Sequence, residues 1–182
     1  HVTFASQSLK RWTDFTVIVP LEKGPEQTRE SPERFPTLYL LHGYTGNCFD
    51  WCTGSNIRAY AEKNKIAVVM PSGENSFYLD DEKADIRYAG FLAELVEFTR
   101  KMFPLSEKRE ETFIGGLSMG GFGALRNGFY YSELFGKVIG LSGAFIQDEL
   151  ADMKEEGNGV APRGYYERVF GDLKTAAGSD KN

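Results

Sequence analysis

The chain has 182 residues, a net charge of −5, and 41% hydrophobic and 26% charged side chains. This length and balance are typical of one globular domain, and they exclude a disordered or fibrous protein. The acidic balance and the lack of a basic block argue against a nucleic-acid partner. No apolar run approaches the roughly 20 residues of a membrane span, so no membrane partner is expected.

The two cysteines, Cys48 and Cys52, lie four residues apart, which is not the spacing of a metal or redox motif. We predict two free thiols in a cytoplasmic protein. The chain begins at His1 without the apolar centre of a signal peptide. The alternative is a secreted protein whose signal has been removed, in which the two cysteines could form a disulfide.

Hydrophobic periodicity and turn residues predict strands that alternate with helices along the chain. The predicted strands are residues 15–21, 37–43, 66–71, 112–117 and 136–145, and the predicted helices are residues 56–65, 91–103 and 120–131. A polar, proline-bearing stretch at residues 22–36 is expected to be an exposed loop or hairpin connection. Pro71 and Gly73 stop the third strand, and Pro104 closes the clearest helix.

The predicted strands are continuous apolar runs, as a parallel sheet covered on both faces requires. The expected fold class is α/β, with a doubly wound, mostly parallel sheet and helices on both of its faces. Residues 146–182 contain no strand of convincing length and are predicted to form short helices and loops, anchored at residues 170–173. No internal repeat or linker divides the chain, so residues 1–182 are read as a single domain.

A glycine-flanked serine follows the predicted strand at residues 112–117. The sequence GLSMG at residues 116–120 matches the nucleophile elbow, a tight strand-to-helix turn that exposes a serine hydroxyl. The flanking glycines allow strand and helix backbones to approach closely, and the amides of the following helix favour an anion. Ser118 is therefore the predicted nucleophile. The alternative is a glycine-rich turn with an incidental serine.

His42 lies in the sequence HGYTG, at the end of another predicted strand. It is either a satisfied turn histidine or the general base for Ser118. A base at this position is disfavoured, because proteins with this elbow have the order serine, acid, histidine along the chain. We interpret HGYTG as the loop whose backbone amide supplies a second oxyanion donor. The predicted donors are the amides of Tyr44 and Met119.

Four segments carry a resemblance to known proteins: LYLLHGYTGNCFDW, VVMPSGENSFY, FPLSEKREETFIGGLSMGGFGALR and SELFGKVIGLSGAF. In this order they resemble the putative-esterase family of α/β-hydrolases. That family includes S-formylglutathione hydrolases of the esterase D type, bacterial tributyrin esterases, feruloyl and acetylxylan esterases, and mycolyltransferases. The chain looks most similar to the tributyrin-esterase group, and the resemblance runs from about Ser8 to the end.

For the nucleophile and the oxyanion donors, the resemblance implies the same residues as the motifs, and it implies no metal or organic cofactor. It places Trp51, Phe77 and Tyr78 at the carboxyl edge of the sheet as substrate-pocket residues, where open α/β sheets bind ligands. Ordinary loop packing is the alternative for each of the three. Residues 146–168 fall where the family has a lid-like insertion over the pocket.

The family places its catalytic acid after the next strand and its catalytic histidine after the last strand. The aspartates that follow the serine in this chain are not preceded by a complete strand: Asp148, Asp152, Asp172 and Asp180. The resemblance therefore implies a domain that is incomplete at its C-terminus, with two edge strands and the triad Asp and His beyond residue 182. The apolar edge left behind is expected to associate with itself or with the missing segment.

The sequence thus predicts a serine carboxylesterase with a small-molecule ester as substrate, either a short acyl ester or an acylated sugar. Ser118 would carry the acyl-enzyme. One alternative is an acyltransferase, which uses the same serine and differs in what excludes water. Another is a non-catalytic binding relative that kept the fold and lost the base. Residues 1–182 alone are expected to hydrolyse esters very weakly, because no base reaches Ser118.

Overall fold

The structure, a computed structural model, describes residues 1–20 and 34–179. Its strands are β1 (Val2–Ser6), β2 (Arg11–Ile18), β3 (Thr37–Leu41), β4 (Ala67–Pro71), β5 (Asp80–Asp81), β6 (Ile86–Arg87), β7 (Thr112–Leu117) and β8 (Lys137–Leu141). Its α-helices are α1 (Asp50–Gly54), α2 (Ile57–Asn64), α3 (Tyr88–Met102), α4 (Met119–Tyr130), α5 (Gln147–Leu150) and α6 (Arg163–Phe170). Short 3-10 helices span Arg109–Glu111 and Ala176–Gly178.

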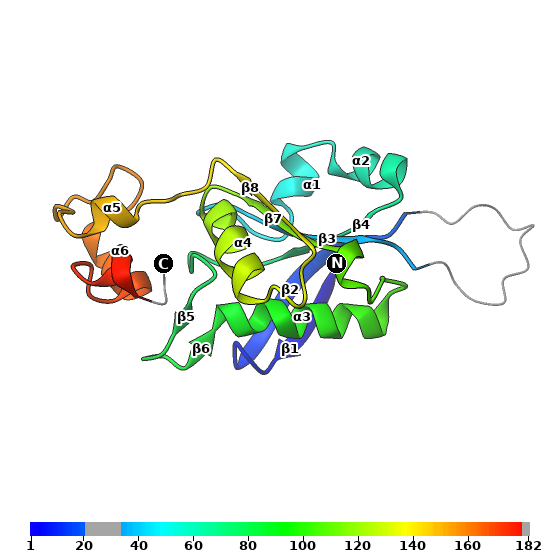
Figure 1. Cartoon of the computed structure of the whole chain (residues 1–182), viewed down its shortest axis with the longest axis horizontal. Helices are drawn as coiled ribbons and strands as arrows, with labels where there is room; N and C mark the ends of the chain where they lie inside the picture. The colour runs from blue at the N-terminus through cyan, green and yellow to red at the C-terminus, as the bar shows by residue number, and fades with distance from the viewer. Residues whose placement is uncertain (21–33, 180–182) are drawn as a thin grey trace, which may run out of the picture.

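Within the described residues, six strands form one sheet in the order β1-β2-β4-β3-β7-β8, and β5 pairs with β6 in a separate hairpin. Strands β4, β3, β7 and β8 are parallel, whereas β2 runs antiparallel to both of its neighbours. The four parallel strands therefore end at the same edge of the sheet. In Figure 1 the segment that contains α5 and α6 lies beyond this edge.

Helices pack against both faces of the sheet, so the predicted doubly wound α/β fold is confirmed. Helices α3 and α4 cover one face, where Phe91 and Phe122 belong to the larger hydrophobic core. Helices α1 and α2 lie on the other face, where Ala61 packs with Val68 and Met70 in a smaller core. In Figure 1 these two helices stand on the side of the sheet opposite α3.

The second face is bare over β7 and β8. The strand register places Leu117, Ile139 and Leu141 on the same side of the sheet as Leu40. These three side chains are 42%, 44% and 44% exposed, respectively. Among the described residues, β8 pairs with β7 alone, so its other edge is open. We call Leu117, Ile139 and Leu141 the bare stripe, a surface of the kind that favours association.

Strand β1 and the β5–β6 hairpin are not predicted by the apolar pattern. The residues of β1 alternate between buried and exposed positions, with Phe4 buried, so no continuous apolar run marks this strand. Strands β5 and β6 have two residues each, too few for any periodicity. Helix α1 is not among the predicted helices either. The predicted strand at residues 112–117 has the same ends as β7, and the other predicted strands and helices are present with shifted ends. The predicted loop at residues 22–36 lies mostly outside the described residues.

The segment from residue 146 to residue 179 contains short helices and no strand, as the sequence predicts. Phe170 anchors it, because its ring lies 5.0 Å from that of Phe77 and 5.9 Å from that of Phe122. Cys48 and Cys52 are both free, also as predicted. None of the helices in the described part of the chain has the length and apolar character needed to cross a membrane.

Candidate active site

Ser118 occupies the turn between β7 and α4. Its φ of 55° and ψ of −117° lie where L-residues are rarely found, a strain of about 1–3 kcal/mol that persists only when the surroundings enforce it. Its amide donates to the Leu141 carbonyl at 2.9 Å, and its carbonyl accepts from the amides of Phe122 and Ala144, each at 3.0 Å. This strand, strained serine and helix have the geometry of a nucleophile elbow.

Gly116 and Gly120 allow the elbow to form. A Cβ on Gly116 would lie 2.2 Å from the carbonyl oxygen of Gly120, and a Cβ on Gly120 would lie 2.5 Å from that of His42. Both contacts are with backbone atoms, so no side-chain movement could relieve them. The two glycines therefore have the steric role that the sequence predicts for them.

The chain that leaves β3 lies beside Ser118. Parallel pairing aligns Leu41 of β3 with Gly116 of β7, so the two strands end together. A Cβ added to Gly43 would lie 3.6 Å from the Cβ of Ser118. The Gly46 amide donates to the Gly43 carbonyl at 3.1 Å, which closes a β-turn over residues 43–46. We call these four residues the β3 turn.

Two backbone amides belong to the elbow and to the β3 turn beside it. The Met119 amide belongs to the first residue of α4, where helix geometry leaves the N–H without an intrahelical acceptor. The Tyr44 amide lies in the β3 turn. Among the described residues, neither amide has a hydrogen-bond acceptor. The elbow and the β3 turn thus contain the two amides that the sequence predicts as oxyanion donors.

His42 is a buried structural residue with both ring nitrogens engaged. Its Nε2 accepts from the Gly73 amide at 2.8 Å, which leaves the proton on Nδ1, and Nδ1 donates to the Gly43 carbonyl at 2.7 Å. Burial lowers the pKa of His42, so the ring is neutral at pH 7. The Gly43 carbonyl and the Tyr44 amide belong to one planar peptide, so His42 orients that amide. The structure therefore places His42 as a turn histidine.

Phe77 and Tyr78 lie together in the loop after β4 and are both buried. Phe77 is 4% exposed, and its ring centroid lies 5.4 Å from that of Phe122. Tyr78 donates its hydroxyl hydrogen to the His42 carbonyl at 3.3 Å. Burial raises the pKa of Tyr78 well above its usual value. Phe77 thus packs against α4, and Tyr78 is hydrogen-bonded to the residue that precedes the β3 turn.

Trp51 does not pack with Phe77 and Tyr78. It lies in α1 and packs against the smaller core on the opposite face of the sheet, with Val68 and Met70. Its indole N–H donates to the Leu41 carbonyl at 3.1 Å. The contacts of Trp51 are those of ordinary packing, the alternative that the sequence leaves open.

Residues with positive φ gather at the carboxyl ends of the parallel strands. Each of the strands β3, β4, β7 and β8 is followed by at least one non-glycine residue in this region: Thr45, Glu74, Phe77, Tyr78, Ser118 and Ser142. The other such residues in the described part of the chain occupy ordinary turns or a helix end: Lys10, Lys65 and Asp85. Strained backbone clusters at functional sites, and open α/β sheets bind ligands at this edge.

The sequence matches the family described as Putative esterase over residues 6–162. The chain belongs to this esterase family. An acetyl esterase of Caldicellulosiruptor saccharolyticus is 47% identical over 186 residues, which cover 100% of this chain and 70% of the relative. An esterase of Mycobacterium tuberculosis is 28% identical over 125 residues, 65% of this chain and 27% of the relative.

Solved structures of serine hydrolases have the same fold as this esterase. FphF, a fluorophosphonate-binding serine hydrolase of Staphylococcus aureus, superposes with a TM-score of 0.85 at 28% identity, over 100% of this chain and 68% of that one. An S-formylglutathione hydrolase of the same organism superposes with a TM-score of 0.81 at 26% identity, over the same shares of the two chains. The similarities support ester hydrolysis and the serine-esterase class.

Helix α6 of the esterase contacts the β3 turn. The ring of Tyr165 meets that of Tyr44 edge-on, with centroids 5.1 Å apart. Within the described residues, the buried Tyr165 hydroxyl has no hydrogen-bond partner, and burial raises its pKa. Sequence reasoning misses Tyr165, because RGYYERVF shows only that a short helix is present. It also misses Asn75, whose segment VVMPSGENSFY carries the family resemblance but gives no sign that the side chain bonds to Thr45.

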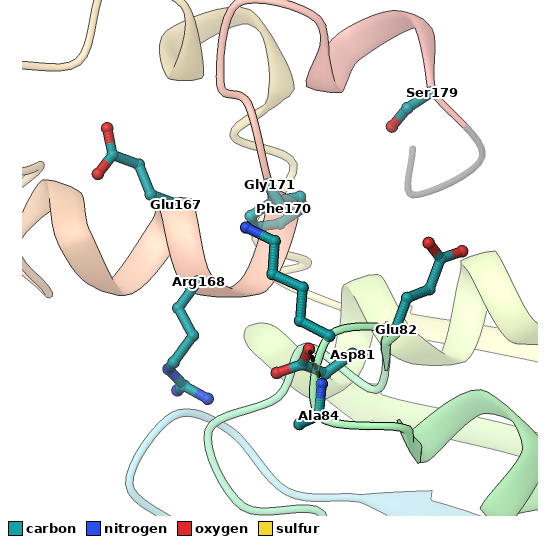
Figure 2. A pocket seen from close by; sticks show the side chains of 9 residues that line it. Asp81, Glu82, Ala84, Glu167, Arg168, Phe170, Gly171 and Ser179 are labelled. Atoms are coloured by element: carbon teal, nitrogen blue, oxygen red, sulfur yellow. Dashed lines mark hydrogen bonds between the residues drawn. The ribbon is translucent and has the colours of Figure 1, made fainter.

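A cavity of about 580 Å³ lies between the β5–β6 hairpin and α6 (Figure 2). Its lining is mostly charged and includes Asp81, Glu82 and Arg168, but neither Ser118 nor the β3 turn. Figure 2 shows Arg168 extending from α6 away from Glu167. A second cavity, of about 390 Å³, borders the β3 turn: it is lined by Thr45, Gly46, Glu74, Asn75, Ser76, Tyr88 and Arg168.

Proposed function

We propose that the protein is a serine carboxylesterase that acts through an acyl-enzyme on Ser118. The observation that carries the proposal is the strained Ser118 beside the amides of Tyr44 and Met119, neither of which has an acceptor among the described residues. A strained serine next to unpaired donors is the arrangement that acyl transfer requires, because negative charge develops on the carbonyl oxygen during attack.

In the proposed reaction, the Ser118 oxygen attacks the ester carbonyl while a base takes the hydroxyl proton. The carbonyl oxygen becomes an oxyanion, which accepts hydrogen bonds from the Tyr44 and Met119 amides. The carbon–oxygen bond to the alcohol then breaks, and the alcohol leaves with the proton. Water releases the acyl group from Ser118 by the same steps, and the base returns the proton to the serine.

His42 cannot be the base, because its two ring nitrogens are hydrogen-bonded to the Gly43 carbonyl and the Gly73 amide. His1 also lies elsewhere, with its ring stacked on Phe49 at 4.9 Å. We therefore assign the triad Asp and His to positions outside residues 1–182, as the family resemblance implies. Residues 1–182 would then form one part of an α/β-hydrolase domain.

Short acyl esters or acylated sugars are the proposed substrates. The acetyl esterase that is 47% identical supports a small acyl group. Phe77 would form the apolar floor of the pocket under the ring of Phe170, while Tyr78 and Trp51 would act through the loops they support. Residues 146–168 would act as a lid, since α6 lies against Tyr44.

Hydrolysis of p-nitrophenyl acetate by the intact gene product tests this proposal. We expect turnover that Ser118→Ala abolishes, while Ser132→Ala, an exposed serine after α4, serves as the matched control and retains it. A fluorophosphonate probe should add its mass to the peptide that contains Ser118 and not to the variant. Turnover that survives Ser118→Ala, or a label on another residue, would show that this serine is not the nucleophile.

A further inference from the structure

The β3 turn contains a residue that its geometry does not favour. Thr45 is the third residue of the turn and has a φ of 64°. Glycine or asparagine is usual at such a position, because a left-handed conformation costs other L-residues about 1–2 kcal/mol and is worse for a β-branched side chain. Contacts from outside the turn must therefore hold Thr45 in place.

Asn75 provides such a contact. Its side-chain Oδ1 accepts a hydrogen bond from the Thr45 amide at 2.7 Å. The Thr45 amide belongs to the peptide that follows Tyr44, whereas the His42 ring bonds to the peptide that precedes it. Side chains from outside the turn thus hold both peptides that flank Tyr44. The direction of the Tyr44 amide depends on these two hydrogen bonds.

Helix α6 holds Asn75 and Tyr44 together. The Arg168 guanidinium donates to the backbone carbonyl of Asn75 at 3.3 Å and lies over the Tyr165 ring, 5.5 Å from its centroid. The Tyr165 ring contacts Tyr44 edge-on. Two side chains of α6 thus support the two central residues of the β3 turn. Tyr165 contacts Tyr44 directly, and Arg168 acts on Thr45 through Asn75.

We propose that Asn75 is a positioning residue for the oxyanion donor at Tyr44, and that Arg168 of α6 keeps Asn75 in place. This inference rests on the proposed function, since it assumes that the Tyr44 amide binds the oxyanion. It makes catalysis at Ser118 depend on the docking of α6. The segment after β8 then has a part in the chemistry as well as in covering the pocket.

A positioning role has a kinetic signature. The oxyanion exists only in the transition state and the tetrahedral intermediate, so a misdirected Tyr44 amide lowers kcat and leaves KM nearly unchanged. Loss of one oxyanion donor costs about 100-fold or more, and misalignment of a donor that is still present should cost less. A loss of packing alone would instead lower the melting temperature without a selective effect on kcat.

The test is a double-mutant cycle between Asn75→Leu and Thr45→Gly in the intact gene product, with p-nitrophenyl acetate as substrate. Asn75→Leu removes the acceptor with little change in volume, and we expect kcat to fall about tenfold at a similar KM. Glycine adopts positive φ without strain, so the turn needs less support in the Thr45→Gly background. There, Asn75→Leu should lower kcat only about two- to threefold.

An unchanged kcat in Asn75→Leu, or an equal loss in both backgrounds, would overturn the proposal. The parent protein distinguishes this outcome from a failure of the proposed function. If its turnover does not depend on Ser118, the proposed function fails before any variant is compared. If its turnover depends on Ser118 and Asn75→Leu leaves kcat unchanged, only the positioning role fails. A binding measurement with a boronic acid that forms an adduct on serine should show the same order of variants as kcat.

Arg168→Met tests the contribution of α6. We expect kcat to fall about two- to threefold, less than in Asn75→Leu, because the bond from Arg168 to Asn75 is longer, at 3.3 Å. Arg58→Met, which removes an exposed guanidinium from α2, is the matched control. Equal kcat values for Arg168→Met and Arg58→Met would show that α6 does not support the turn through this residue.

Discussion

The elbow around Ser118 and the β3 turn lie side by side, but they are stabilised in different ways. Backbone hydrogen bonds with residues of β8 and α4 hold the elbow, and Gly116 and Gly120 leave room for its close backbone contacts. The β3 turn is held by the side chains of His42, Asn75 and Tyr165, which come from separate segments. The motif of the elbow is therefore contiguous along the chain, whereas Asn75 and Tyr165 support the β3 turn from distant parts of the chain.

This difference predicts how each half responds to substitution. A side chain added in the elbow should cause a large loss of stability and activity, because the backbone atoms that it would meet have no room to move. Changes around the β3 turn should be graded, since each side chain supplies one of several supports. Substitutions at four positions, ordered from the largest expected effect to the smallest, test this contrast and the exposed surfaces beside the site.

Gly120→Ala should have the largest effect. Its Cβ would lie 2.5 Å from the His42 carbonyl oxygen and 2.6 Å from that of Leu41. We expect the free energy of unfolding to fall by about 3 kcal/mol or more, with loss of esterase activity. Urea unfolding measures it. Gly164→Ala, where a Cβ meets nothing within 4 Å in α6, is the control and should gain about 0.5–1 kcal/mol. Similar effects of the two changes would mean that the elbow is not rigid.

His42→Phe should have the next largest effect, because it leaves the buried Gly73 amide without an acceptor and the Gly43 carbonyl with the Gly46 amide as its one remaining donor among the described residues. We expect a loss of about 2–4 kcal/mol in the free energy of unfolding at pH 8. Thermal unfolding with circular dichroism measures the change. A loss below about 1 kcal/mol would contradict the role assigned to this ring.

The same variant tests the pH dependence. Burial lowers the pKa of His42 below its usual 6.5 in the folded state. As the pH falls, this histidine is therefore protonated at a higher pH in the unfolded chain than in the folded protein. The stabilisation is complete above about pH 6.5 and is lost as pH falls through the folded pKa. The parent protein should therefore lose more stability between pH 7 and pH 5 than His42→Phe does. Parallel stability curves would contradict a buried neutral ring.

Tyr165 separates packing from hydrogen bonding at the β3 turn. Tyr165→Leu removes the aromatic contact with Tyr44 and should lower stability by about 1 kcal/mol. Tyr165→Phe keeps the ring and removes a buried hydroxyl that has no partner in the described part of the chain. It should therefore keep or raise the melting temperature. A marked rise in KM for Tyr165→Phe would instead show that the hydroxyl binds substrate.

The bare stripe should affect association more than stability. For a polypeptide of residues 1–182, we expect concentration-dependent self-association that Ile139→Thr weakens, because Ile139 is 44% exposed on the uncovered half of the sheet. Sedimentation velocity measures it. Val160→Thr, which changes a 63% exposed side chain outside the sheet, should leave association unchanged. A polypeptide that stays monomeric at all concentrations would contradict this expectation.

The sequence is sufficient to predict the elbow because its motif is contiguous along the chain, although β8 also contributes a hydrogen-bond acceptor to Ser118. The strand, the serine, the glycines and the helix are contiguous, and the predicted strand at residues 112–117 has the ends of β7. The placement of Tyr44 next to Ser118 follows from the parallel pairing of β3 with β7. The predicted fold class follows from the continuous apolar strands in the same way.

The supports of the β3 turn could not be predicted, because their spacing along the chain carries no pattern. Asn75 lies 30 residues from Thr45, and Arg168 lies 93 residues from Asn75. Their contacts depend on where the loop after β4 and helix α6 settle in three dimensions. Strand β1 escapes prediction for a different reason, since its residues alternate at an edge of the sheet.

The positive φ angles at the ends of the parallel strands set a limit on engineering this protein. Replacing Thr45 or Glu74 by glycine or asparagine would relieve local strain and raise thermal tolerance. At Thr45, glycine would hold the turn with less help from Asn75, but its wider range of backbone angles would direct the Tyr44 amide less narrowly than the supported threonine does. Stability and turnover should therefore trade off at these positions. A search for heat-resistant variants that keeps every glycine or asparagine substitution at these positions would select stable proteins that hydrolyse esters slowly.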